Sequence, residues 1–86
     1  MYQTFVVITM AGTKVEEKRL KSIGEKLKKI RISSGYKSAE IFAYDNVLNR
    51  VQYWRMERGA NFTMQSLFKI LEIHEVSMEE FFQDIL

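Results

Sequence analysis

Apolar residues recur at helical spacing through most of this chain, beginning near residue 15. The first apolar stripe repeats at intervals of three, four and three, and consists of Leu20, Ile23, Leu27 and Ile30. Such spacing places every member on one face of a helix, which we expect over residues 15–33. Several lysines lie off that stripe: Lys18, Lys21, Lys28 and Lys29. Gly35 is expected to end this helix, because glycine readily adopts the left-handed conformation found there.

Four shorter helices are predicted downstream from residues that favour helix starts. The expected N-caps, whose side-chain oxygens accept from free N–H groups of the first turn, are Ser38, Asn49, Thr63 and Ser77. The helix after Ser38 should reach about residue 44, and the helix after Asn49 should end before Gly59. Ser77 and Glu80 have the spacing of a capping box. The pattern therefore predicts an all-α fold with five helices.

The first thirteen residues follow a different pattern. Residues 4–9 are β-branched and aromatic, which favours a strand, and no charge occurs from Met1 to Ala11. The segment lacks a basic start and is too short to span a bilayer, so we expect neither a signal peptide nor a membrane anchor. Residues 2–8 could pair with the same strand of a second subunit, or be an extension upstream of an initiator at Met10. We favour pairing, because an unpaired apolar strand invites aggregation.

Composition and charge add limits to this picture. Eighty-six residues, 47% of them hydrophobic, are enough for one small core, so residues 14–86 are expected to form a single domain after the extension 1–13. The chain has no cysteine, which agrees with a cytoplasmic location. Charge is polarised: residues 14–37 hold nine basic and three acidic residues, whereas residues 60–86 hold one and five. That polarity would orient the domain on a polyanion, although a solvated helix face and an acidic last helix would give the same counts.

The helix that follows Asn49 carries the most informative chemistry. Tyr53 and Met56 are three residues apart and should face the core. The outer faces are then left to Arg50, Val51, Gln52, Trp54, Arg55 and Arg58. Arginine can donate two hydrogen bonds to guanine, and arginine and glutamine can bind phosphates. With the short helix before it and the turn at residues 45–48, this segment has the pattern of a helix-turn-helix.

Residues 38–59 resemble the helix-turn-helix of the Cro/phage-repressor (XRE-type) family. The matching positions are Phe42, Ala43, Leu48, Tyr53, Met56, Glu57 and Gly59. The resemblance extends over residues 23–82, because the first, fourth and fifth predicted helices also fall where that family has them. It implies a compact, five-helix, lambda-repressor-like domain that binds double-stranded DNA.

Three positions depart from the family pattern. Ala39 replaces a glutamine that often touches DNA, so that contact is lost. Val47 replaces the glycine of the turn, and we expect Asn46 or Asp45 to supply any left-handed residue there. Glu75 replaces the glycine that usually ends the fourth helix, which leaves the end of that helix without a predicted cap.

The resemblance also implies roles for individual residues. The expected base contacts are Arg50, Val51, Trp54 and Arg55, and the expected phosphate contacts are Lys37, Ser38, Gln52, Arg58 and Asn61. Trp54 could instead pack against the preceding helix or a second subunit, and Arg58 could be a solvated surface charge. Related repressors place a buried ion pair at the positions of Arg31 and Glu57, and we expect that pair here.

We therefore expect a sequence-specific DNA-binding transcriptional regulator, acting as a homodimeric repressor without a cofactor. The alternative is a protein-interaction module that keeps the helix-turn-helix but binds a protein partner, as antitoxin-type regulators do. Catalysis has little support: there is no glycine-rich phosphate loop and no Cys/His cluster with metal-ligand spacing. The single histidine, His74, is expected to be a cation at the end of the fourth helix.

Overall fold

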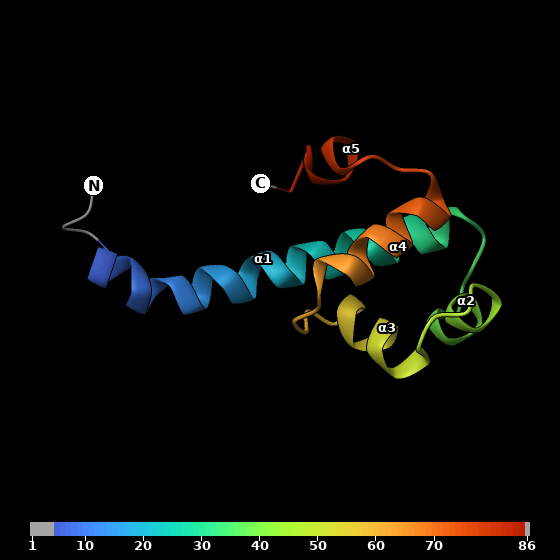
Figure 1. The fold of residues 1–86 in the computed structure, drawn as a ribbon, viewed down its shortest axis with the longest axis horizontal. Helices are drawn as coiled ribbons and strands as arrows, with labels where there is room; N and C mark the ends of the chain where they lie inside the picture. The colour runs from blue at the N-terminus through green and yellow to red at the C-terminus, as the bar shows by residue number, and fades with distance from the viewer. Residues whose placement is uncertain (1–4, 86) are drawn as a thin grey trace.

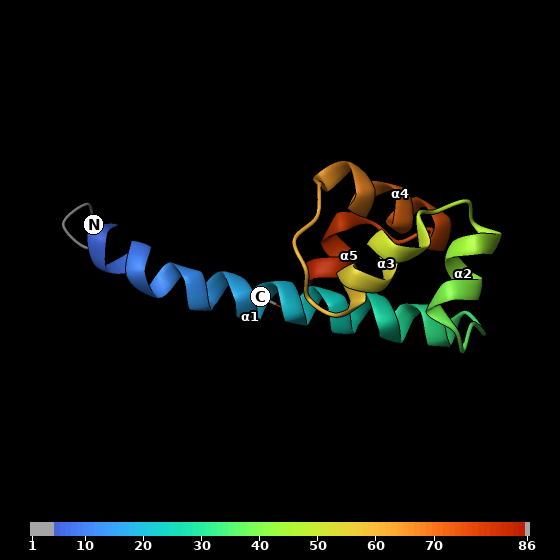
Figure 2. The same ribbon diagram turned by 90° about the horizontal axis from the view of Figure 1, so that it is seen from below.

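The computed structural model describes the backbone of residues 5–85 and the side chains of residues 14–85, and the fold is all-α. Within residues 5–85 there are five helices and no strand (Figure 1). Their bounds are α1 Phe5–Ser33, α2 Ala39–Asp45, α3 Arg50–Glu57, α4 Met64–His74 and α5 Met78–Phe82. The helices α2 to α5 gather around the C-terminal half of α1, and the predicted fold class is confirmed (Figures 1 and 2).

Helix α1 corrects the prediction for the N-terminal segment. It is 29 residues long and begins at Phe5, about ten residues before the predicted start, so the strand expected over residues 4–9 is wrong for residues 5–9. Residues 2–4 of the expected pairing strand lie outside the described residues. A helix satisfies its backbone groups internally, whereas a lone strand needs a second chain. The N-terminal half of α1 extends away from the other helices, and the expected boundary at residues 13 and 14 lies within it (Figure 2).

The predicted N-caps begin the four shorter helices. The side-chain oxygens of Ser38, Asn49 and Thr63 each accept a hydrogen bond from a backbone N–H three residues later. At α5, Ser77 and Glu80 form the predicted capping box, with both hydrogen bonds at 3.1 Å. These contacts are local in sequence, and each satisfies an N–H that the helix leaves free.

The first four helices all end in the same way. In each case a residue with positive φ follows the helix, and the next residue donates its N–H to a carbonyl five positions earlier, which is a Schellman motif. The positive-φ residues are Gly35 (95°), Val47 (57°), Gly59 (93°) and Glu75 (55°). The predicted left-handed residue of the turn was therefore wrong: Val47 has this conformation, and Asn46 has φ −104°. The fourth helix is capped by Glu75 itself.

One core joins the helices. Its fully buried hydrophobic members are Leu27, Phe42, Ala43, Tyr53, Met56, Leu67, Ile70, Leu71 and Phe81. Helix α3 lies directly on α1 at Gly24, where an added Cβ would be 2.5 Å from the carbonyl oxygen of Met56. Only a residue without a Cβ allows this approach. The backbone of α3 is therefore held close to the C-terminal half of α1.

His74 is half-buried in the last turn of α4 and packs on the core residue Phe42, which opposes the charge expected of it as a helix-end cation. Its ring stacks on Phe42 with ring centroids 5.1 Å apart and an angle of 3° between the planes. Its Nδ1 lies 3.1 Å from the hydroxyl oxygen of Ser34. Burial lowers the pKa of His74 below its ordinary value, because the charged imidazolium is less well solvated there. The neutral ring is therefore favoured.

Candidate nucleic-acid interface

The candidate interface is the outer face of α3. Asn49 caps α3, and burial of Tyr53 and Met56 turns the opposite face to solvent. Every residue placed there by the sequence is exposed: Arg50, Val51, Gln52, Trp54, Arg55 and Arg58. The four predicted base contacts lie together around one shallow hollow of about 420 Å³, together with Glu40 of α2.

Glu40 is a neighbour of this face that the sequence analysis missed. One of its carboxylate oxygens lies 3.8 Å from Nη1 of Arg50, and both side chains are more than half exposed. An exposed ion pair of this length contributes little to stability. Arg50 can therefore leave Glu40 for a stronger acceptor. The sequence did show an acidic residue in the first turn of α2, but not that this turn lies beside Arg50 at the start of α3.

Trp54 and Arg58 are predicted contacts that touch each other. The guanidinium carbon of Arg58 lies 4.2 Å from the centroid of the Trp54 ring, which is a cation–π contact. Trp54 keeps 47% of its surface exposed. The contact directs the charge of Arg58 along the side of α3 that faces α1.

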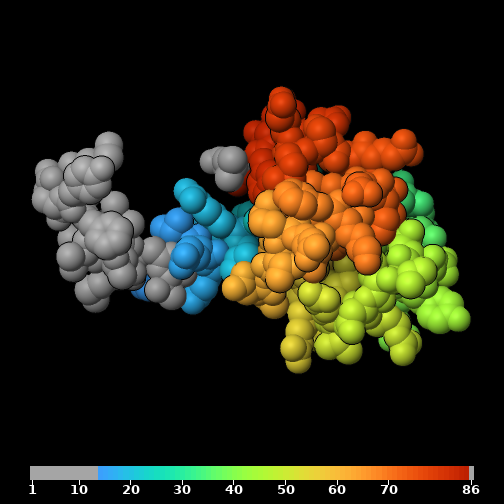
Figure 3. Space-filling model, in the orientation of Figure 1, coloured from blue at the N-terminus to red at the C-terminus, as the bar shows by residue number. Residues whose placement is uncertain are grey.

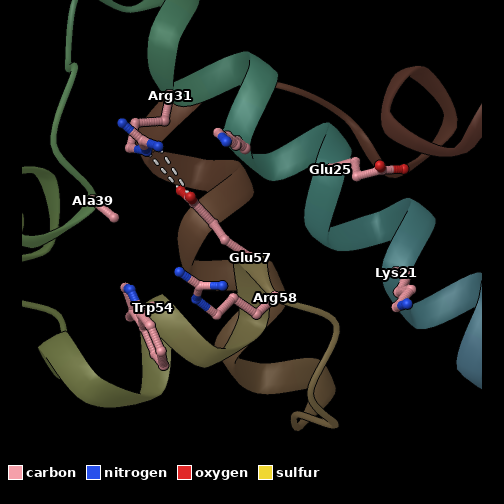
Figure 4. Close-up of a pocket in the computed structure, with 8 residues that line it drawn as sticks. Lys21, Glu25, Arg31, Ala39, Trp54, Glu57 and Arg58 are labelled. Atoms are coloured by element: carbon pink, nitrogen blue, oxygen red, sulfur yellow. Dashed lines mark hydrogen bonds and ion pairs between the residues drawn. The ribbon is translucent and has the colours of Figure 1, made fainter.

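A second hollow, of about 440 Å³, lies between side chains of α1 and α3, beside the point where the two helices touch (Figure 4). It is lined by Lys21, Glu25, Lys28, Arg31, Ala39, Trp54, Glu57 and Arg58. Two cations of α1, Lys21 and Lys28, thus lie across from Arg58, although neither was among the predicted site residues. Both lysines lie off the apolar stripe of α1 in the sequence. That spacing did not predict that α3 packs beside them, because that arrangement depends on tertiary structure.

The ion pair expected between Arg31 and Glu57 is present and buried. Arg31 donates to Glu57 through Nε (2.6 Å) and Nη2 (3.0 Å), and through Nη1 to the carbonyl of Tyr36 (2.8 Å). Only 4% and 7% of the two side chains are exposed. The hydrogen bond to Glu57 raises the pKa of Arg31, and burial beside Glu57 raises that of the Tyr53 hydroxyl. The pair joins the last turns of α1 and α3 (Figure 4).

The predicted phosphate contacts other than Arg58 are spread around this face. Lys37 is exposed just before α2, and Ser38 is half-buried as its cap. Gln52 donates through Nε2 to the hydroxyl of Ser66 at 3.1 Å, so it links α3 to α4. Asn61 is exposed after α3, and its side-chain oxygen accepts from the next backbone N–H at 2.9 Å. The structure does not bring these residues into one cluster with the base-contact candidates.

Large apolar side chains are also exposed on the helix-turn-helix. The exposed fractions are 56% for Ile41, 73% for Tyr44, 86% for Val47 and 60% for Val51. Single exposed apolar residues are ordinary, but several on one short motif are suited to a partner surface.

Comparisons with known proteins add no relative. No protein-family model, curated protein or solved structure matches this chain. Among the residues that the structure describes, no helix is long and apolar enough to cross a membrane, and no three side chains of metal-ligating type gather at one place.

Proposed function

We propose that this chain is a sequence-specific, double-stranded DNA-binding transcriptional regulator of the Cro/phage-repressor type. The observation that supports the proposal most strongly is that α3 exposes arginines on its outer face and is at the same time held in a fixed position on α1. Arg50 and Arg55 are exposed on α3, while the buried Arg31–Glu57 pair holds α3 on α1. A rigidly placed helix with exposed arginines is what base recognition in a major groove requires.

In this proposal α3 enters the major groove with its N-terminal end toward the bases. Arg50 and Arg55 donate to guanine, and Val51 meets a thymine methyl group. Arg58 and Lys37 bind phosphates on either side. The working form is a cytoplasmic, homodimeric repressor, which would place two α3 helices on half-sites about one helical turn apart.

The test is selection of the purified chain against a library of random duplexes, followed by titration of the selected sequence at several salt concentrations. The proposal expects one enriched motif with a twofold axis and an affinity that falls steeply as salt rises. Enrichment of no sequence, together with no duplex binding at low salt, would reject DNA recognition.

The exposed apolar residues favour a second candidate function, a protein-interaction module. Ile41 and Tyr44 on α2 and Val47 in the turn before α3 offer exposed apolar contact area that phosphates do not use. A protein partner bound there would cover the base-reading face, as expected for an antitoxin-type regulator. Replacing Tyr44 and Val47 by serine should then abolish partner capture and leave duplex binding intact, whereas replacing Arg55 should weaken duplex binding.

A further inference from the structure

Four lysines form a continuous ridge along α1. Lys14, Lys18, Lys21 and Lys28 follow one another at intervals of four, three and seven residues. On a helix with 3.6 residues per turn these intervals place all four within one narrow face. All four side chains are exposed, and none takes part in an ion pair among residues 14–85. We call this set the lysine ridge.

The ridge lies on the side of α1 that faces α3. Lys28 and Lys21 line the hollow that Arg58 and Trp54 close from the other side. A Cβ added to Gly59 would lie 2.9 Å from Cγ of Lys21, so the stem of this lysine packs on the end of α3. The ridge therefore continues the positive surface that begins at Arg58.

The outer half of the ridge extends beyond the helix-turn-helix. Residues 14–18, which include two of these lysines, lie in the part of α1 that extends away from α2 to α5 (Figures 1 and 3). At a rise of about 1.5 Å per residue, Lys14 and Lys28 are about 20 Å apart along the axis. This distance corresponds to about six base pairs of B-form DNA.

The side chains of the ridge are suited to binding a polyanion and not to binding a membrane. Val15 is an exposed apolar residue that flanks the ridge, about 60° around the helix axis from Lys18. Glu17 and Glu25 are the acidic residues on or beside the ridge. A membrane-binding helix would need an apolar face next to its cations. Over residues 14–28 the ridge itself carries no apolar side chain, and a row of spaced cations of this kind matches a phosphate backbone.

We propose that the lysine ridge binds phosphates of the duplex that flanks the half-site read by α3. The inference rests on the proposed function and extends it: DNA is bound beyond the bases that α3 covers, along the projecting part of α1. The flank is recognised by its charge, so its sequence is not read.

The test compares two neighbouring residues of α1. Lys18 and Arg19 are both exposed, but Arg19 lies off the ridge, so Lys18→Gln and Arg19→Gln remove equal charge from different faces. A third variant, Lys14→Gln/Lys18→Gln, removes the outer half of the ridge. Each is titrated across salt concentrations on the selected site, first with flanks of eight base pairs and then trimmed to the motif.

The proposal expects the double variant to lower the slope of log affinity against log salt by about two on the flanked duplex, because each phosphate contact contributes about 0.9. Lys18→Gln should lower it by about one and Arg19→Gln by much less. On the trimmed duplex the variants should match the original chain. Equal losses for Lys18→Gln and Arg19→Gln, or no loss for the double variant, would overturn the ridge while DNA recognition stands. Failure of the original chain to bind any duplex would overturn both.

Discussion

At the scale of single residues, the position of α3 depends on a few buried groups. All three guanidinium nitrogens of Arg31 donate hydrogen bonds, two of them to Glu57 and one to the carbonyl of Tyr36. The pair is buried, so its charges have little access to water. Removing one partner leaves the other charge buried and alone, and that cost is larger than the net contribution of the intact pair.

We therefore predict that Arg31→Met lowers the free energy of unfolding by about 3–5 kcal/mol. Urea denaturation followed by circular dichroism measures this change. The matched control is Arg31→Met/Glu57→Met, which removes both charges and should recover a large part of the loss. A single variant that unfolds at the same urea concentration as the original chain would contradict the prediction.

His74 gives a prediction for mildly acidic pH. Burial against Phe42 lowers the pKa of His74 below its ordinary value of 6.5. The unfolded chain therefore binds the proton first as pH falls, and the stability present above about pH 6.5 is lost progressively toward the lower pKa of the folded state. Unfolding measured from pH 7.5 to 5 should show this loss, and His74→Gln should flatten it.

The carboxylates provide an internal control for that experiment. The backbone N–H of Ser77 lowers the pKa of Glu80, and Lys26 lowers that of Asp84, so both carboxylates titrate in the folded protein below their ordinary pKa values of 4.5 and 3.8. Their contribution is present above their unfolded pKa values and is lost only as pH falls through the folded ones. The loss below pH 4.5 should remain in His74→Gln. An unchanged curve between pH 7.5 and 5 would contradict the role given to His74.

At the scale of elements, the turn between α2 and α3 is held in a conformation that its sequence disfavours. Val47 has φ 57°, where a β-branched side chain crowds its own backbone. The N–H of Leu48 donates to the carbonyl of Ala43 at 2.8 Å and completes the Schellman motif. Leu48 packs against the core, so the tertiary position of α3 imposes the strained residue before it.

Val47→Gly should therefore stabilise the fold by about 1 kcal/mol, because relief of left-handed strain exceeds the added freedom of the unfolded chain. The side chain of Val47 is 86% exposed, so little packing is lost. Val51→Gly is the matched control: it removes an exposed valine from within α3 and should cost about 1 kcal/mol. The two midpoints of thermal unfolding should move in opposite directions. A lower midpoint for Val47→Gly would show that the turn is not strained.

These elements show which features could be predicted from sequence. The starts of α2 to α5 were predictable because Ser38, Asn49, Thr63 and Ser77 act on N–H groups three residues away. The start of α1 was not, because residues 5–9 have strand propensity and a helix that is already formed can continue through them. The left-handed conformation of Val47 was missed for a related reason. Residue propensity favours Asn46 for that conformation, but the packing of the helices imposes it on Val47.

The site was predictable to the same degree. The exposed face of α3 follows from the spacing of Tyr53 and Met56, and the Arg31–Glu57 pair follows from the family resemblance. The contacts between Gln52 and Ser66 and between Arg58 and Trp54 were not predicted. The first contact depends on how α4 returns to the domain, which local spacing does not determine. The second joins residues four positions apart at the end of α3, so that spacing could have indicated it.

At the scale of the whole molecule, charge follows the arrangement of the helices. The basic residues of segment 14–37 lie on α1 and the loop after it, whereas the five acidic residues of segment 60–86 lie on α4, α5 and their connections. The basic helix borders α3, and the acidic helices form another side (Figure 1). A polyanion approaching this molecule is therefore drawn toward the α1–α3 side and away from α4 and α5.

Sequence-specific contacts to bases and sequence-independent attraction to phosphates can therefore be tested with different variants. Arg50 and Arg55 are five positions apart on α3, about 140° around its axis, so they should reach different base pairs. We expect Arg50→Ala and Arg55→Ala each to lose about 1–3 kcal/mol on the selected site and little on random duplexes. Lys37→Ala should weaken both kinds of duplex and flatten the salt dependence, because a phosphate contact carries no sequence information.

Titrations on matched duplexes with and without the selected motif measure the difference directly. The weak pair between Arg50 and Glu40 supplies a control: Glu40→Gln leaves Arg50 in place, so it should keep or improve discrimination between the two duplexes. If Arg50→Ala and Arg55→Ala lose as much on random DNA as on the motif, these arginines are phosphate anchors. The base contacts would then have to come from other exposed residues of α3, of which Val51 and Trp54 are the ones that share its hollow.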